Sequence, residues 1–146
     1  MTATKKSIVS ALGILQIFIG IGAVPVGIMF IVDPTGASVG FPLDWLAGTT
    51  FKNYLVPGIF LFGVNGIGSL FGAFLTVRRH ILASLAAVGL GAFLMAWIVV
   101  QVITLGPPLH WLQMLYFVLG AAELLLGWRM NPNVVRNVIV IDVGRD

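Results

Sequence analysis

The sequence has no cysteine, and its only two histidines, His80 and His110, lie far apart among the 146 residues. The lack of cysteine excludes disulfides, thiol redox chemistry and thiolate-bound metals. Two distant histidines are a poor basis for a histidine metal site. We therefore expect neither a metal nor a cofactor.

Charged side chains are also scarce. They make up 9% of the residues, whereas hydrophobic residues make up 59% and the mean hydropathy is +1.07. A soluble domain carries about 25% charged residues. So few charges cannot solvate the surface of this chain, which predicts that most of its surface faces a lipid bilayer. The net charge of +3 comes from basic residues beside apolar runs, which indicates topology signals and no nucleic-acid partner.

Four apolar runs are long enough to cross a hydrocarbon core of ~30 Å, which takes about 20 helical residues. Backbone groups in lipid must bond internally, and none of the runs alternates in polarity as barrel strands do. The sequence therefore predicts an all-α polytopic membrane protein, a four-transmembrane-helix bundle. A signal peptide is the alternative for the first run, which is too long for one. The expected helices are 7–32, 54–77, 81–105 and 109–128, within a transmembrane domain of residues 1–130.

The basic residues predict the orientation, because cytoplasmic loops are enriched in lysine and arginine. Only Lys52 falls in the outer segment that also holds Asp33 and Asp44. The bias predicts a multi-pass protein of the cell membrane, in bacteria the inner membrane, with both termini cytoplasmic (N-in/C-in). The other basic residues all lie on the opposite side: Lys5, Lys6, Arg78, Arg79, Arg129, Arg136 and Arg145.

Two segments lie outside the predicted spans. The outer loop, 33–53, contains Phe41, Trp45 and other apolar residues, which predict a short interfacial helix or a lid on the bundle. The tail, 131–146, is rich in β-branched residues and too short to span the membrane. We expect an extended, partly ordered cytoplasmic tail packed on the bundle. The alternative is a strand that pairs with another subunit or a partner.

Glu123 is the most informative residue, because an ionisable group within a span is costly and marks a functional hypothesis. Gln113, Tyr116, Gly120 and Glu123 are separated by three, four and three residues, so they share one helical face. Such a stripe is typical of a cavity lining, although polar contacts between packed helices look similar. The alternative for Glu123 is that it snorkels to the inner interface or pairs with Arg129.

Polar residues on the other spans extend this set. Asn65 lies near the middle of its span, where we expect an interhelical hydrogen bond or, as the alternative, direct ligand contact. Gln16 is placed to meet Glu123 on the inner side. The candidates for ligand binding or cavity lining are Glu123, Gln113, Tyr116, Asn65, Ser69, Trp97, Gln101 and Gln16, and those for the outer mouth are Asp44, Trp45, His110 and Trp111.

The overall plan resembles that of the small bacterial four-helix membrane proteins of the DoxX-like kind, many of them uncharacterised. The resemblance rests on four spans in a short chain, glycine-rich helices and a carboxylate in the last span, here Glu123, and it covers residues 7–128 in outline. It implies redox-linked membrane partners, which a chain without cysteine would assist and not replace.

No catalytic set is recognisable, because paired carboxylates, a Ser/His/Asp arrangement and a phosphate-binding glycine loop are all lacking. The leading hypothesis is a small membrane protein of binding or accessory type that holds a lipid, another apolar ligand or a partner membrane protein. The alternative is a subunit of an oligomeric transporter or proton-coupled channel with Glu123 as its titrating group. A third class, an isomerase or hydrolase, would use Glu123 as general acid and base.

Overall fold

The computed structural model describes residues 2–106 and 110–143, and in this part of the chain every regular element is a helix. The four longest helical stretches are apolar enough to cross a membrane, which confirms the predicted all-α, four-helix plan. The elements are α1 (Ala3–Val32), the 3₁₀ helices η1 (Ala37–Val39) and η2 (Leu43–Leu46), α2 (Leu55–Phe60), the π-helix η3 (Leu61–Gly68), α3 (Ser69–Val77), α4 (Ala83–Leu105), α5 (Trp111–Met130) and α6 (Pro132–Val143).

The helix bounds differ from the predicted ones by a few residues. The first helix begins at Ala3 and not at residue 7, and its N-cap is Thr2, whose hydroxyl accepts a hydrogen bond from the backbone amide of Lys5. The third begins at Ala83, two residues after the predicted start. The predicted start of the fourth helix, residue 109, lies outside the described residues.

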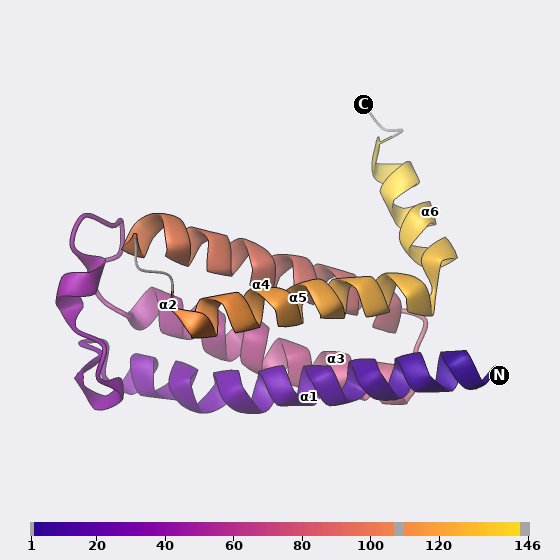
Figure 1. Ribbon diagram of the computed structural model, residues 1–146, viewed down its shortest axis with the longest axis horizontal. Coiled ribbons are helices and arrows are strands. Elements are labelled where there is room, and N and C mark those ends of the chain that lie inside the picture. Colours follow the sequence, from indigo (N-terminus) through magenta and orange to yellow (C-terminus); the bar gives the residue numbers. More distant parts are fainter. Residues whose placement is uncertain (1, 107–109, 144–146) are drawn as a thin grey trace.

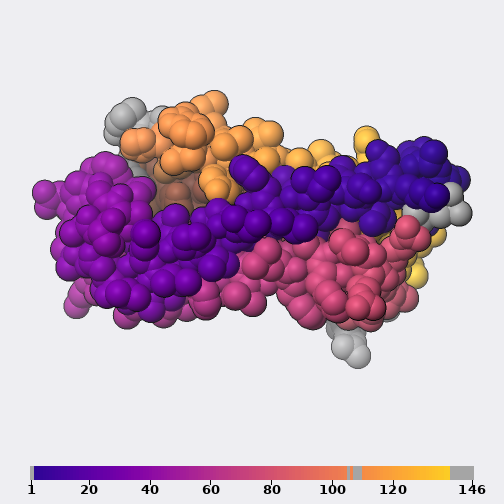
Figure 2. All heavy atoms as spheres, turned by 90° about the horizontal axis from the view of Figure 1, so that it is seen from below, coloured from indigo at the N-terminus to yellow at the C-terminus, as the bar shows by residue number. Residues whose placement is uncertain are grey.

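The helices form an elongated bundle with two distinct ends (Figure 1). The start of α1, the turn 78–82 and α6 lie at one end, here called the terminal end. The segment 33–54 lies at the other, here called the loop end. From the side, α1 crosses one face of the bundle between α5 and α3 (Figure 2). The turn 78–82 is short, with Arg79 at a φ of 52°, so α3 and α4 are antiparallel neighbours.

The outer surface of the bundle is strongly apolar along all four long helices. Large side chains such as Ile21, Phe71 and Ile103 are more than half exposed. In water, so much exposed apolar area would be strongly unfavourable, whereas in hydrocarbon it carries no penalty. The surface and the helix lengths together suggest a multi-pass membrane protein.

Small residues let α4 and α5 approach closely. A Cβ added at Gly91 would lie 2.6 Å from the backbone oxygen of Gly120 and 2.6 Å from the backbone nitrogen of Leu124. Both contacts are with backbone atoms, which cannot rotate away. Gly91 and Gly120 therefore bring the two backbones together in the manner of small-residue interfaces in membranes.

The second span is not a uniform α-helix as predicted. Its middle third, η3, is a π-helix between α2 and α3. A π-helix places about one more residue in each turn, and it occurs frequently at functional sites. An almost wholly apolar segment gives no sequence signal that distinguishes the two periods, so this feature was missed.

The prediction of an extended or strand-forming tail is wrong, because residues 132–143 form the helix α6. Pro132 occupies the first helical position, where proline is favoured. Val135 is fully buried at the terminal end of the bundle. The low helix propensity of β-branched residues is worth less than about 1 kcal/mol each, so packing of this kind overrides it.

The predicted outer loop, residues 33–53, has a defined structure that includes the 3₁₀ helices η1 and η2. Its start is fixed by Asp33, whose carboxylate accepts hydrogen bonds from the Thr35 hydroxyl (2.5 Å) and the Ser38 amide (2.9 Å). These bonds hold the pKa of Asp33 below its ordinary value. Its end is fixed by Tyr54, whose hydroxyl donates to the Pro42 carbonyl (2.9 Å). The short helix expected near Trp45 is present as η2.

Candidate functional site

A series of buried side-chain hydrogen bonds links three helices in the half of the bundle toward the terminal end. Its members, Thr76, Gln16 and Glu123, are here called the polar chain. The hydroxyl of Thr76, on α3, donates to Oε1 of Gln16, on α1, at 2.8 Å. Nε2 of Gln16 then donates to Oε1 of Glu123, on α5, at 3.1 Å. All three side chains have no exposed surface. The expected meeting of Gln16 and Glu123 is thus present, and Glu123 does not snorkel to an interface or pair with the exposed Arg129.

The fourth helix joins this region through Ser84, at the start of α4. Its hydroxyl donates to the backbone carbonyl of Gly127 on α5. A bond to a backbone carbonyl does not depend on a partner side chain, so it holds α4 and α5 together at the terminal end. Ser84 is fully buried as well.

A glycine makes room for the Gln16 amide. A Cβ added at Gly72, on α3, would lie 2.9 Å from Nε2 of Gln16. Any larger residue there would displace the Gln16 side chain, which bridges Thr76 and Glu123. Gly72 therefore belongs to the polar chain although it contributes no polar atom to it.

Three buried polar atoms have no hydrogen-bond partner among the residues that the structure describes. They are Oε2 of Glu123 and both side-chain amide atoms of Asn65. The interhelical hydrogen bond expected for Asn65 is therefore not formed within the described residues. Asn65 is 1% exposed and lies in the π-helix η3. An unpartnered polar group of this kind is costly and needs an explanation.

The rest of the predicted stripe on α5 mostly faces inward. Gln113 is buried, and its side-chain oxygen accepts a hydrogen bond from the backbone amide of His110 (3.0 Å), so it caps the helix. Tyr116 is half-buried, with its hydroxyl beside Gly22 of α1. The predicted candidate Ser69 is not part of this stripe, because it lies on α3, where it is buried on the inward face of that helix. The stripe thus packs helices together over most of its length and does not line either of the two pockets described below, except at Gln113.

Aromatic side chains gather in a pocket of about 90 Å³ at the loop end. Tyr54 stacks on Phe30 with ring centroids 4.8 Å apart, and Trp97 contacts Phe51 and Phe60 edge to face or at a tilt. The predicted candidates Trp97 and Gln101 both line it. The other lining residues are Phe30, Phe41, Trp45, Leu46, Phe51, Tyr54, Pro57, Val100 and Thr104.

Two of the four residues predicted for the outer mouth, Asp44, Trp45, His110 and Trp111, lie side by side. Trp45 and His110 are neighbours, with ring centroids 5.6 Å apart, and Trp45 also lines the aromatic pocket. Asp44 is exposed on the loop, and Trp111 is 69% exposed. A tryptophan so exposed at a helix end is typical of the membrane headgroup level.

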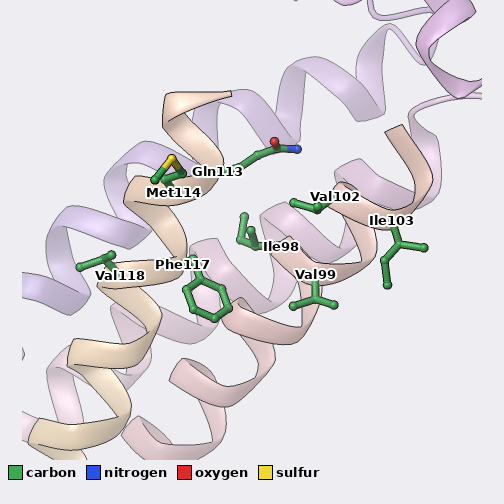
Figure 3. Close-up of a pocket in the computed structure, with 8 residues that line it drawn as sticks. All are labelled: Ile98, Val99, Val102, Ile103, Gln113, Met114, Phe117 and Val118. Atoms are coloured by element: carbon green, nitrogen blue, oxygen red, sulfur yellow. The ribbon is translucent and has the colours of Figure 1, made fainter. Parts of the chain in front are cut away.

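A larger groove of about 300 Å³ lies between α4 and α5 toward the loop end (Figure 3). Sequence reasoning missed it, because none of its residues except Gln113 is polar. It opens on the outer surface, where Ile103, Met114 and Val118 are each more than 60% exposed. Its lining consists of Ile98, Val99, Val102 and Ile103 from α4 and Gln113, Met114, Phe117 and Val118 from α5.

The glycine contact explains why this groove is where it is. The backbones of α4 and α5 meet at Gly91 and Gly120, and the two helices diverge from there toward the loop end (Figure 1). Branched and aromatic side chains such as Ile98 and Phe117 then occupy only part of the widening space (Figure 3). The groove therefore follows from the position of the glycines along each helix.

Thr76 of the polar chain and Ser84 at the start of α4 were also missed. Thr76 follows Asn65, Ser69 and Gly72 at the spacing four, three, four, so the inward face of the second span pointed to it. Ser84 lies near the predicted start of its span, where a polar residue attracts no notice.

No protein-family model, no curated protein and no solved structure matches the chain. The resemblance to DoxX-like proteins therefore stays a prediction.

Proposed function

We propose that this protein is a multi-pass protein of the cell membrane, with both termini cytoplasmic, that works by binding the acyl chain of a membrane lipid in the groove between α4 and α5. The groove itself carries this proposal. Seven of its eight lining residues are apolar, and it opens where hydrocarbon would surround the bundle.

The size of the groove favours a lipid chain over a partner helix. Its volume of about 300 Å³ is at the lower end of ligand pockets. A helix with its side chains is about 10–12 Å across and would need a longer, wider seam. A single flexible acyl chain needs no polar partner, and the groove offers only Gln113, whose side-chain oxygen already caps α5.

The positions of the charges support the orientation. Among the residues that the structure describes, six basic side chains are exposed at the terminal end, whereas the loop end holds Lys52 with Asp33 and Asp44. Cytoplasmic segments are enriched in basic residues, and acidic residues contribute little to the bias. This distribution supports an orientation in which the terminal end is cytoplasmic and the aromatic pocket lies toward the outer surface.

Filling the groove is expected to expel the lipid. Val118→Trp would place a large ring among the lining residues, while Leu125→Trp is the matched control. Leu125 is one heptad further along α5, equally exposed, and does not line the groove. A packing loss of about 1.4 kcal/mol would lower lipid retention about tenfold. Native mass spectrometry of the two variants from the same membranes measures the lipid adducts.

Equal loss of lipid from both variants, or from neither, would contradict the proposal. In the first case, the bound lipid would belong to the general annulus around the bundle. In the second, the groove would hold no lipid that survives isolation.

A second candidate is a subunit of an oligomeric transporter or proton-coupled channel. The observation in its favour is Glu123, fully buried and with Oε2 unpartnered among the described residues. An ionisable group at that depth marks proton and ion paths in many membrane proteins. A bundle of four helices encloses little volume, so a pore would need several copies of the chain. A strictly monomeric particle in mild detergent would therefore contradict this candidate.

A further inference from the structure

The helix α6 is unlike the others in direction. It leaves the terminal end at a steep angle to the long axis of the bundle and extends beyond its side (Figure 1). When the bundle axis follows the membrane normal, α6 runs close to the plane of the membrane surface. It packs on the ends of α4 and α5, with Val135 fully buried there.

The first turns of α6 have two different faces. Val134, Val135 and Val138 fall on one side of the helix at the spacing of an apolar stripe, and Val138 is 44% exposed. Asn133, Arg136 and Asn137 fall on the opposite side and are exposed. A short helix with one apolar and one polar, basic side is typical of segments that lie in the membrane interface.

The terminal end around α6 is strongly basic. Its exposed cationic side chains are those of Lys5, Lys6, Arg78, Arg79, Arg129 and Arg136. Among the residues whose side chains the structure describes, no acidic residue lies at this end, and none of the six is in a salt bridge. These six side chains give the described part of the terminal end a net positive charge that attracts anions outside the protein, and Arg78 also lies over the Phe74 ring.

From these observations we propose that α6 is an interfacial helix and that, with the basic residues of the terminal end, it forms a binding surface for the headgroups of anionic phospholipids. The apolar side of α6 enters the acyl-chain boundary beside the bundle, and Arg129 and Arg136 reach the phosphate groups. A membrane surface suits this end better than a soluble anionic partner, because the apolar side of α6 projects past the bundle to where lipid lies. This surface is separate from the α4–α5 groove, and neither proposal depends on the other.

The lipid preference is tested by charge removal. The purified full-length chain is titrated in nanodiscs or by native mass spectrometry with phosphatidylglycerol and phosphatidylcholine. We expect a preference for phosphatidylglycerol that falls about fivefold for each arginine removed, since each contributes about 1 kcal/mol. Arg129→Gln with Arg136→Gln should lower it about 25-fold. Lys52→Gln, the matched change at the loop end, should leave it unaltered. All three side chains are exposed, so the fold tolerates these changes.

The position of α6 is tested in a separate experiment with single introduced cysteines. The native chain has no cysteine, so each introduced one is labelled without background. A spin label at Val138→Cys should be shielded from a water-soluble relaxation agent in liposomes, and one at Asn137→Cys should be accessible. Equal accessibility at both positions would overturn the interfacial placement. Equal affinity for the two lipids, or an equal loss in the Lys52→Gln variant, would overturn the anionic surface. If Val118→Trp lowers the binding of phosphatidylcholine and of phosphatidylglycerol equally, the lost binding belongs to the groove, and the preference for phosphatidylglycerol at the terminal end is unchanged.

Discussion

Replacing Gly91 with alanine is expected to lower the free energy of unfolding by about 1–3 kcal/mol, as overpacking of a tight interface commonly does. The added methyl group would lie 2.6 Å from two backbone atoms of α5, the Gly120 oxygen and the Leu124 nitrogen. Neither atom can move without shifting the whole helix, so α4 and α5 must separate. Reversible unfolding in mixed detergent micelles measures the change.

Gly89 provides the control on the same helix. A Cβ added there meets nothing within 4 Å, so Gly89→Ala introduces no clash. Alanine is the better helix former by about 1 kcal/mol, so this variant should be as stable as the native protein or slightly more so. The same chemical change two residues apart is therefore expected to have opposite signs. If both variants gained stability, the close approach of α4 and α5 would be wrong.

Replacing Gln16 with leucine is expected to destabilise the bundle by about 1–3 kcal/mol, because it leaves buried polar groups without partners. The change removes both hydrogen bonds of the polar chain and isolates the Glu123 carboxyl between helices. In lipid, leucine gains little by burial, because the surrounding chains are as apolar as the bundle core. The loss of the bonds is therefore not offset. The same unfolding measurement detects it.

Glu123→Gln is the matched variant for this experiment. Its side-chain oxygen can still accept the bond from Nε2 of Gln16, so stability should stay within about 1 kcal/mol of the native value. The variant also separates the two candidate functions, because an amide cannot carry a proton. Proton flux in liposomes that the native protein supports and Glu123→Gln abolishes would favour the transporter. A Gln16→Leu variant as stable as the native protein would show that the polar chain does not hold the helices together.

The sequence predicted the plan of the bundle well, because a long apolar run leaves a chain in lipid little choice. Backbone groups must bond within the segment, so each run becomes a helix. The spacing of Gln113, Gly120 and Glu123 also predicted the inward face of α5, and all three are buried. These features depend on residues close together in the chain, where helical geometry alone decides.

Features that depend on how two helices meet were not predictable in the same way. The groove depends on where Gly91 meets Gly120, and glycine is too frequent in this chain to mark one contact in advance. The partner of Gln16 on α3 depended on the rotation of that helix, which the π-helix η3 changes. The helix α6 was missed because its β-branched residues predict an extended chain, whereas the packing of Val135 on the bundle outweighs that local propensity.

The most direct test of the proposed membrane topology is the labelling of single cysteines in intact cells with a thiol reagent that does not cross membranes. The native chain has no cysteine, so each signal comes from one chosen site. Thr4, Thr50 and Asn137 are exposed, and they lie near the start of α1, in the outer loop and on α6. We predict that Thr50→Cys is labelled in intact cells and that Thr4→Cys and Asn137→Cys are labelled only after permeabilisation. Labelling of either end of the chain in intact cells would contradict a bundle that spans the membrane four times with both termini in the cytoplasm.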